Sequence, residues 1–328
     1  MEFIMKINLQ HGNGGRETSQ IINDIFMKFF DNSILRKLED AAVIDGAQKL
    51  AFTTDSFVVE PLFFQGGNIG DLCICGTVND LAMVGATAKY FTIGFITEQG
   101  MDTSTLERIC ESIKNRAIEA NVKIVAGDTK VVGGNGGLYI NTSGIGFVDK
   151  SISVSGAKTG SSVIISGNLG DHHAAILSAR MGIENGIKSD VAPLGGMVKA
   201  LIDEGIPIQA MRDITRGGLG GILNEIALSS KCAIEIDEEL IPVSDNVRGL
   251  CDTLGLDPLY MGNEGKMALI VPETHADKAI SIMRGHKYGE NACTIGRVTK
   301  GAGVFVNTKI GGKRRLPEMS GDGLPRIC

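Results

Sequence analysis

The chain has 328 residues, of which 43% are hydrophobic and 21% charged, and its formal net charge is −6 at pH 7. This composition predicts a globular protein of about two domains and excludes a disordered chain, while the acidic balance argues against general nucleic-acid binding. No apolar run reaches membrane-spanning length, and the N-terminal residues are too polar for a signal peptide, so a cytoplasmic location is expected.

The first half of the chain alternates between helical and extended patterns. Between 103 and 120, Leu106, Ile109 and Ile113 recur at helical spacing, with charged residues on the opposite side. Segments rich in β-branched and aromatic residues are typical of strands. Helices are therefore predicted over 18–30, 70–84 and 103–120, and strands over 49–59, 89–97 and 138–148.

The second half continues the mixed pattern after a polar, small-residue stretch at 150–160, which predicts a domain boundary. A strand is predicted over 162–166, and helices over 172–181, 196–203 and 217–229. Apolar periodicity ends near residue 311. The predicted organisation is an N-terminal domain over 1–152, a C-terminal domain over 153–310 and a mobile tail over 311–328.

The seven cysteines are scattered and none forms a CxxC pair, so reduced thiols are expected rather than a disulfide framework. Cys73 and Cys75 share an apolar segment without further metal ligands nearby and are interpreted as structural. Cys328 is the last residue. A thiol at the end of a flexible arm can carry a covalently attached group into a pocket elsewhere on the protein, and an incidental terminal thiol is the alternative.

Glycine is unusually frequent, at 44 residues, and it is clustered at 12–15, 66–70, 133–137 and 217–221. Glycine allows backbone amides to approach a ligand closely. Several such loops in one chain therefore predict phosphate binding by backbone amides. Ordinary turns are the alternative, above all at 133–137, which lies between two predicted strands.

Four carboxylates stand beside apolar segments of the first half: Asp40, Asp55, Asp80 and Asp128. A buried charge needs a partner, and carboxylates that hold Mg²⁺ against a polyphosphate supply one. Helix caps and turns are the alternative for each residue.

The second half adds cations and one further acid. Arg212 and Arg216 come just before a glycine-opened helix, which suits either anion binding or surface charge. Glu264 lies between glycines just before an apolar run, a position that suits a general base or a turn acid. The adjacent pair His172 and His173 lacks the further ligands that zinc requires. The absence of Walker A, GxGxxG and GxSxG patterns argues against P-loop, Rossmann and serine-hydrolase sites.

Taken in order, these segments resemble the HypE family of hydrogenase maturation proteins, carbamoyl dehydratases within the PurM-like group of ATP-dependent enzymes. The matching stretches are 11–15, 53–59, 76–82, 127–132, 211–219, 263–266 and 325–328. The carboxylate motifs are shared across the whole superfamily and imply ATP use alone. The closing Pro-Arg-Ile-Cys sequence is narrower and points to this family.

The resemblance implies a two-domain PurM-like fold of the α+β or α/β class. Its N-terminal domain has a mixed sheet that forms a barrel in a homodimer, its C-terminal domain is α/β, and a flexible tail follows. It also implies that a partner, HypF, carbamoylates Cys328, and that the S-carboxamide is dehydrated to a thiocyanate at the cost of ATP. A HypC–HypD complex would then receive the cyanide for the iron of [NiFe]-hydrogenase.

The resemblance also implies roles for individual residues. Cys328 would carry the substrate, while Glu264 and Lys130 would deprotonate nitrogen and stabilise transferred charge. Glu264 is favoured as the base, because lysine needs a strongly lowered pKa for that task. Mg²⁺ would be held by Asp40, Asp55, Asp80 and Asp128. The ATP phosphates would be contacted by Gly12, Gly14, Gly15, Asp55, Asn79, Asp80, Asp128 and Thr129.

Two other classes of function stay open at this point. The first is another PurM-like ATP user, such as selenophosphate synthetase, aminoimidazole ribonucleotide synthetase or thiamine monophosphate kinase. Selenophosphate synthetase places its reactive residue near the N-terminus, whereas the first cysteine here is Cys73. The second is a thiol carrier or scaffold whose ATP site is structural.

Overall fold

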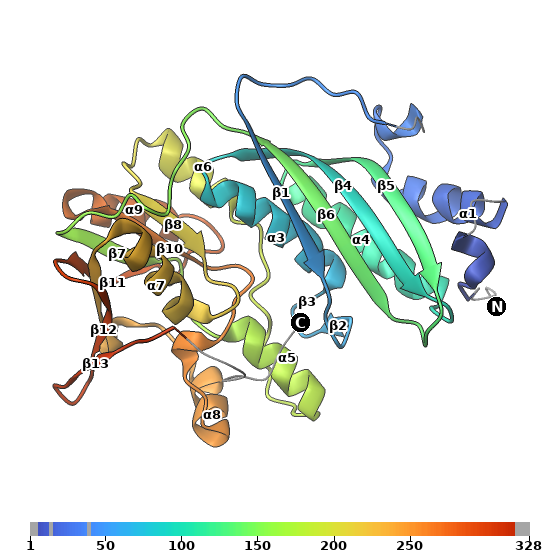
Figure 1. The fold of residues 1–328 in the computed structure, drawn as a ribbon. Coiled ribbons are helices and arrows are strands. Elements are labelled where there is room, and N and C mark those ends of the chain that lie inside the picture. Colours follow the sequence, from blue (N-terminus) through green and yellow to red (C-terminus); the bar gives the residue numbers. More distant parts are fainter. Residues whose placement is uncertain (1–5, 13–15, 38–40, 319–328) are drawn as a thin grey trace.

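The computed structural model describes residues 6–12, 16–37 and 41–318. It consists of two domains of strands and helices that meet along one buried helix, α3 (Ile69–Met83) (Figure 1). The fold is the two-domain, mixed α/β architecture that the sequence predicts.

The first domain is built on a four-stranded sheet of order β1-β6-β4-β5. The strands are β1 (Leu50–Phe57), β4 (Thr87–Glu98), β5 (Lys123–Val132) and β6 (Leu138–Phe147). β4 and β5 run parallel, and the other neighbours are antiparallel. Helices α3 and α4 (Thr103–Glu119) cover one face of the sheet (Figure 1). The remaining elements are η1 (Leu9–Gly12), α1 (Arg16–Ile21), the π-helix η2 (Ile22–Phe26), α2 (Met27–Phe30), η3 (Leu35–Lys37), β2 (Phe63–Phe64) and β3 (Gly67–Asn68).

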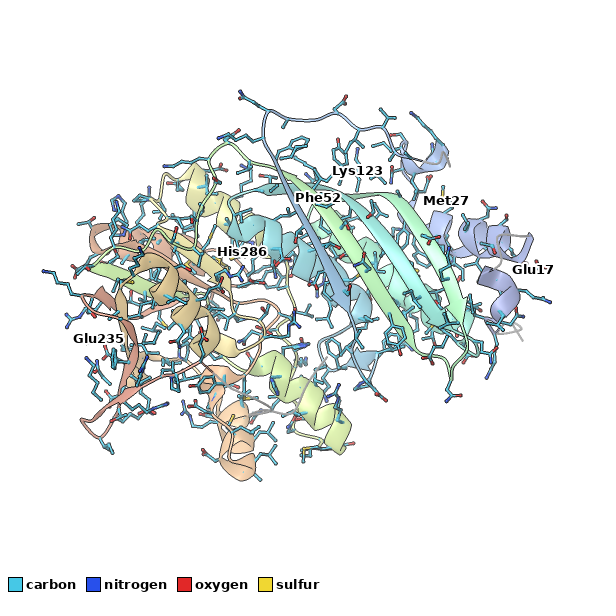
Figure 2. All side chains as sticks on the ribbon, viewed as in Figure 1. Glu17, Met27, Phe52, Lys123, Glu235 and His286 are labelled. Atoms are coloured by element: carbon cyan, nitrogen blue, oxygen red, sulfur yellow. The ribbon has the colours of Figure 1, made fainter. Side chains whose placement is uncertain are left out.

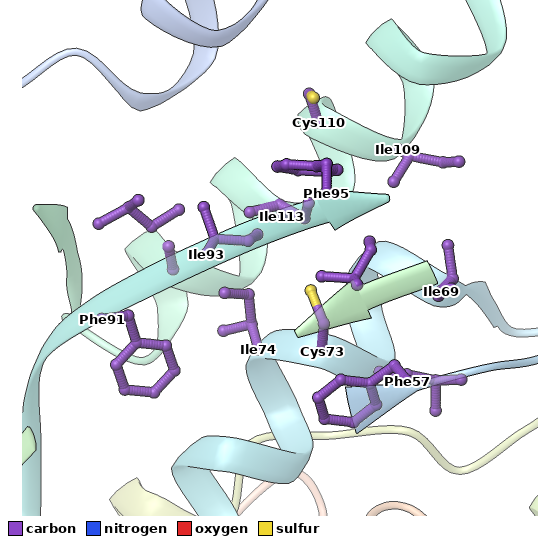
Figure 3. Packing of buried hydrophobic residues seen from close by; sticks show 14 of the residues in the cluster. Phe57, Ile69, Cys73, Ile74, Phe91, Ile93, Phe95, Ile109, Cys110 and Ile113 are labelled. Carbon is purple, nitrogen blue, oxygen red and sulfur yellow. The ribbon is translucent and has the colours of Figure 1, made fainter. Parts of the chain in front are cut away.

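The core of this domain lies between the sheet and its two helices. Phe91, Ile93 and Phe95 alternate along β4 and point toward α4 and α3 (Figure 3). Because side chains alternate between the two faces of a strand, the residues between them face away from the helices. Among the described residues, helices therefore cover one face of this sheet and leave the other open.

Helix α3 is buried along almost its whole length because the second domain covers the side that the sheet does not. Asn68 caps its first turn, accepting from the Gly70 N–H at 2.8 Å, and Asp71 accepts from the Asn68 N–H at 2.9 Å. Cys73 and Cys75 lie inside this helix and are fully buried, which confirms their structural interpretation. Burial raises the pKa of both thiols well above the usual range.

The second domain is a seven-stranded sheet of order β13-β12-β9-β11-β7-β10-β8, in which only β9 and β12 pair in parallel. The strands are β7 (Ser161–Ile165), β8 (Ala210–Asp213), β9 (Ala233–Asp237), β10 (Met267–Pro272), β11 (Cys293–Thr299), β12 (Gly303–Asn307) and β13 (Lys313–Arg315). Helix α7 (Gly218–Ser230) packs on one face, and α6 (Gly195–Asp203) and α9 (Ala276–Arg284) on the other. The other helices are α5 (Asp171–Met181), η4 (Glu238–Leu240), α8 (Asp245–Leu254), η5 (Pro258–Tyr260) and η6 (Glu273–His275).

The expectation of a mobile tail from residue 311 is wrong for its first seven residues. Lys313–Arg315 form β13 on the edge of the large sheet, and Leu316 is completely buried. Asn224 Nδ2 donates to the Leu316 carbonyl at 2.9 Å, and the Tyr260 hydroxyl donates to the Pro317 carbonyl at 2.8 Å. The second domain therefore continues to Pro317. The rest of the predicted tail, beyond Glu318, lies outside the described residues.

The predicted helices and strands all recur within a few residues of their expected bounds. No helix in the described part of the chain is long and apolar enough to cross a membrane.

Candidate active site

A cleft of about 320 Å³ opens between the two domains. Its first wall is β1 together with α3, and its second wall is the connection from β8 to α7 together with residues 262–264. Its charged and imidazole side chains are Asp55, Asp80, His172, Arg212, Asp213, Arg216 and Glu264. The structure thus brings together three residues predicted for the site, Asp55, Asp80 and Glu264.

Asp55 and Asp80 face each other from β1 and α3. Thr53 lies on the same side of β1 as Asp55, and its hydroxyl donates to Asp80 Oδ2 at 2.9 Å. Burial raises the pKa of Asp80, and burial followed by the charge of Asp80 raises the pKa of Asp55. Two partly buried carboxylates, one of which has its charge destabilised by the other, favour a cation beside them.

Asp213 and Glu264 complete the acidic side of the cleft. Asp213 ends β8, and burial raises its pKa to about 6, with the charge of Asp80 adding to the effect. Burial also raises the pKa of Glu264 well above its usual range, and the charges of Asp213, Asp190 and Asp55 raise it further. Raised carboxylate pKa values are common where proteins use proton transfer. Sequence reasoning missed Asp213, although its position between an apolar strand and Gly217–Gly218 was a usable signal.

Asn79 is next to Asp80 in the sequence but does not face the cleft. It is buried, and its Oδ1 accepts from the Leu194 N–H at 2.7 Å. Its Nδ2 donates to the carbonyls of Ala192 at 3.1 Å and Glu264 at 3.4 Å. Successive residues of a helix point about 100° apart, which separates Asn79 from its neighbour. In this geometry Asn79 holds other backbone segments, which disagrees with its predicted contact to phosphate.

His172 enters the cleft from the start of α5. Its Nδ1 lies 2.8 Å from the Ser189 hydroxyl, and its ring meets the Phe64 ring edge-on. Burial lowers the pKa of His172 to about 4, so the imidazole is neutral at pH 7. The arginines are less enclosed, and Arg212 forms an ion pair with Glu225 at 3.2 Å.

Asp128, Thr129 and Lys130 line a different cavity, of about 230 Å³, at the outer edge of the first sheet. Lys130 Nζ donates to Asp128 Oδ1 at 2.9 Å, and this hydrogen bond lowers the pKa of Asp128. Both side chains are more than half exposed. The inner wall of this cavity is apolar and includes Phe26, Phe30, Ile93 and Phe95.

Sheet order explains why the predicted residues separate into two groups. Asp55 is paired across the sheet with Thr142, Thr142 with Ile93, and Ile93 with Gly127. Three strand spacings place the backbone at Asp55 about 14 Å from the backbone beside Asp128. The register also puts Asp128 on the open face of the sheet and Asp55 on the helix-covered face. Of the predicted Mg²⁺ ligands that the structure describes, Asp55 and Asp80 therefore lie together and Asp128 lies apart from them.

The described residues do fit a simpler magnesium site. They contain no group of three or more acidic, histidine or cysteine side chains close enough to enclose a metal ion. Mg²⁺, however, is commonly held by one or two carboxylates together with phosphate oxygens and water. Asp55 and Asp80, two partly buried carboxylates that line the same cleft, match that requirement.

Some predicted site residues lie outside the described residues: Asp40, Gly14, Gly15 and Cys328. Gly12 ends the short helix η1.

Comparisons with known proteins place the chain in a family. Residues 38–148 match the family of AIR synthase related proteins, N-terminal domain, and residues 158–309 match the corresponding C-terminal domain. The carbamoyl dehydratase HypE of Escherichia coli (strain K12) is 43% identical over 98% of this chain and 99% of its own. The chain belongs to the HypE family.

Two solved structures of HypE proteins define this relationship further. A hydrogenase maturation protein HypE in complex with ATP superposes with a TM-score of 0.94 at 43% identity, covering 98% of this chain and 99% of that one. HypE from a HypE–HypF complex superposes with a TM-score of 0.80 at 44% identity, covering 91% and 99%. The HypE family is a family of enzymes, since its named members are carbamoyl dehydratases.

Proposed function

We propose that this protein uses ATP to dehydrate an S-carbamoyl group on Cys328 to a thiocyanate, which supplies cyanide for the iron of [NiFe]-hydrogenase. The observation that carries the proposal is the acidic cleft between the domains, with Asp55 and Asp80 on one wall and Glu264 on the other. Membership of the HypE family, and the relative solved with ATP, support it.

The reaction needs an activated oxygen and a base. The amide oxygen of the S-carboxamide attacks the γ-phosphorus of ATP, and the bond from that phosphorus to the β-bridging oxygen breaks to release ADP. The C–O bond then breaks with loss of phosphate. Nitrogen gives up both protons, one to a base and one to the departing phosphate, which leaves S–C≡N. The oxygen of the lost water ends in phosphate.

Each group of residues has a task in this scheme. Asp55 and Asp80 would hold Mg²⁺, which when bound neutralises charge on the ATP phosphates. Glu264 accepts the proton from nitrogen, because a carboxylate whose pKa is raised is a stronger base than an ordinary one. Arg216 offers a positive charge beside these acids, since it opposes the rise in the pKa of Glu264.

The separate position of Lys130 is explained if the enzyme is a homodimer, as predicted. β1 and β5 are the two edge strands of the first sheet, and each lies beside one of the two groups of predicted site residues. When β1 of one copy lies next to β5 of the other, two such sheets close a barrel. Residues 128–130 of one subunit would then lie at the strand edge next to Asp55 of its partner, and Thr129 would share the helix-covered face of that residue.

The open face of the first sheet supports the same assembly. It exposes a set of large apolar side chains: Leu50 (55% exposed), Phe52 (70%), Ile96 (45%), Val132 (38%) and Tyr139 (38%). Phe52 stands on β1 (Figure 2). A sheet with one uncovered apolar face usually buries that face against another element. A second copy of the chain offers the same apolar face, so the two faces can pack together.

We also propose HypF as the carbamoyl donor and a HypC–HypD complex as the cyanide acceptor. The HypE–HypF structure of a relative supports the first of these partners. The cytoplasmic location is likewise a proposal, consistent with the absence of disulfides among the described cysteines.

A mass measurement on the full-length protein tests the function. Protein carbamoylated on Cys328 is mixed with ATP and Mg²⁺, and the expected result is loss of the mass of one water together with release of ADP. Cys328→Ser should accept no carbamoyl group while it binds ATP normally.

The other outcomes separate the alternatives. Retention of the carbamoyl group with ATP present would identify a carrier. An unmodified Cys328 alongside ATP-dependent turnover of a small molecule would identify a synthetase or kinase.

A further inference from the structure

The backbone of Glu264 is held from both sides by one segment, residues 189–194, which connects α5 to α6. The Glu264 N–H donates to Asp190 Oδ1 at 3.0 Å. The Glu264 carbonyl accepts from the Ala192 N–H at 3.3 Å and from Asn79 Nδ2 at 3.4 Å. These contacts fix the peptide groups on either side of the Cα atom from which the Glu264 carboxylate projects.

Asp190 is in turn held by a residue of the Glu264 turn itself. Lys266 Nζ lies 3.2 Å from Asp190 Oδ2, and the exposed fractions of the two side chains are 12% and 4%. Lys266 Nζ also donates to the Gly265 carbonyl at 3.3 Å. The turn at 264–266 and Asp190 therefore form a closed ring: backbone N–H to carboxylate, carboxylate to ammonium, and ammonium back to the same turn.

Gly265 shows how close the two segments are. A Cβ atom at this position would lie 1.9 Å from the Asp190 carbonyl oxygen and 2.9 Å from the Ala192 Cβ atom. Any side chain would push the turn away from the 189–194 segment. The main chains on both sides of Glu264 thus have little space in which to move.

Because Asp190 and Lys266 are nearly buried, each of their charges needs the other as compensation. A carboxylate that is 4% exposed is costly to bury unless a cation lies beside it. Asp190 Oδ2 has no aligned hydrogen bond among the described residues, so the ammonium of Lys266 is its compensation. Removal of either partner alone leaves an uncompensated charge next to the Glu264 turn.

We infer that Asp190 and Lys266 are positioning residues for Glu264: they hold its backbone so that its carboxylate stays at the nitrogen of the S-carboxamide. This inference rests on the proposed function, because it needs Glu264 to be the base. A general base acts only within hydrogen-bonding reach of its proton, and a displacement of the order of 1 Å can cost about 100-fold in rate.

The alternative is that the pair only ties the 189–194 segment to the 264–266 turn by charge. The two interpretations differ in what Asp190→Asn does. Its amide oxygen still accepts from the Glu264 N–H, although the charge is lost. A positioning role therefore predicts that Asp190→Asn keeps more activity than Asp190→Ala, whereas a purely electrostatic tie predicts that both variants lose the same amount.

The test is a single-turnover assay on full-length protein carbamoylated at Cys328, with thiocyanate formation followed by mass. Asp190→Ala should lower the rate at saturating ATP by about 10- to 100-fold, with the ATP concentration for half-maximal rate changed by less than about twofold. Asp190→Asn should recover most of that loss. An equal loss in both variants, or a loss that higher ATP corrects, would overturn the inference.

Two further variants keep the test decisive. If Asp190→Ala fails to fold, the double variant Asp190→Ala/Lys266→Met removes both buried charges and should be folded yet equally slow. Tyr288→Phe is the matched control, because it removes a hydroxyl contact between the domains to Glu119, away from the cleft, and should leave the rate unchanged.

Glu264→Gln separates the inference from the function on which it rests. If Glu264→Gln is fully active, Glu264 is not the base and the proposed function needs another one. If Glu264→Gln is inactive while Asp190→Ala keeps the normal rate, only the positioning role is wrong.

Discussion

The charged residues of the cleft between the domains are enclosed by one chain, whereas those of the edge cavity at Asp128 are left exposed. In the cleft, Asp55, Asp80 and Asp213 are enclosed by both domains, and burial raises the pKa of each. At the edge cavity, Asp128 and Lys130 are 71% and 62% exposed and neutralise each other. Buried charges without enough partners are costly and indicate a built ligand site, whereas an exposed ion pair contributes little by itself.

This difference suggests that the edge cavity is half of a site. Its two charged residues have the chemistry that a phosphate or an amide needs, but the described part of the chain leaves both more than half exposed. The second half of the site would be the cleft of another subunit.

Mixed dimers provide the strongest test of this comparison. Asp55→Ala and Asp128→Ala should each lower turnover by at least about 100-fold as homodimers. When both variants are produced together with different tags, the purified mixed dimer contains one intact site if the halves come from different subunits. About half of the wild-type activity should return. If the two halves belong to the same chain, no activity returns.

The second test concerns the affinity of the cleft for MgATP. Asp80→Asn removes a partly buried carboxylate that would hold Mg²⁺ and should weaken MgATP binding by about 10- to 100-fold while the fold is preserved. Isothermal titration calorimetry measures the change, and circular dichroism checks the fold. Unaltered affinity for MgATP would count against the role of Asp80.

The open sheet face should control assembly. Phe52→Glu places a charge in the centre of the exposed apolar set, and desolvation of that charge should weaken dimerisation by at least about tenfold. Analytical ultracentrifugation measures the dimer dissociation constant. Leu228→Glu is the control, because Leu228 is 77% exposed on α7 in the other domain. Equal effects of the two substitutions would argue against this interface.

The last test concerns pH and stability rather than activity or assembly. Burial raises the pKa of Asp213 from 3.8 to about 6, so the folded state prefers the protonated carboxyl. This group's contribution to stability is fully present below pH 3.8 and is lost as the pH rises through 6. Without ATP and Mg²⁺, Asp213→Asn should therefore be more stable than the wild type by about 3 kcal/mol at pH 8 and by about half as much at pH 5. Urea unfolding at both pH values measures the difference, and a gain independent of pH would contradict the assignment.

The sequence predicted most of the fold, and the reason is visible in its helices. Helix α4 repeats apolar residues at helical spacing, and strands such as β4 are rich in β-branched and aromatic residues, so local patterns identify them. Strand β13 was missed because its three residues are all basic. Its place depends on pairing with β12 and on the burial of Leu316, and neither can be read locally.

The candidate site was predicted in composition but not in arrangement. Asp55, Asp80 and Asp128 were recognised as acids beside apolar segments. Their distribution depends on strand order, because β5 pairs with β4 at the far edge from β1. Asn79 shows the limit of sequence adjacency, since a one-residue step along a helix turns it from the cleft into the contact with residues 192–194.

The attachment of residues 316 and 317 to Asn224 and Tyr260 limits the distance that the proposed carrier Cys328 could span. Eleven residues follow Pro317, and a fully extended chain of that length spans at most about 37 Å. Tyr260 also packs on Gly220 of α7, whose N-terminal end adjoins the cleft residue Arg216. If Cys328 carries the substrate as proposed, its thiol would be a reactant on a short tether, and short tethers give effective concentrations in roughly the millimolar range. A group carried on Cys328 would compete for the cleft at that concentration, however dilute the protein itself is.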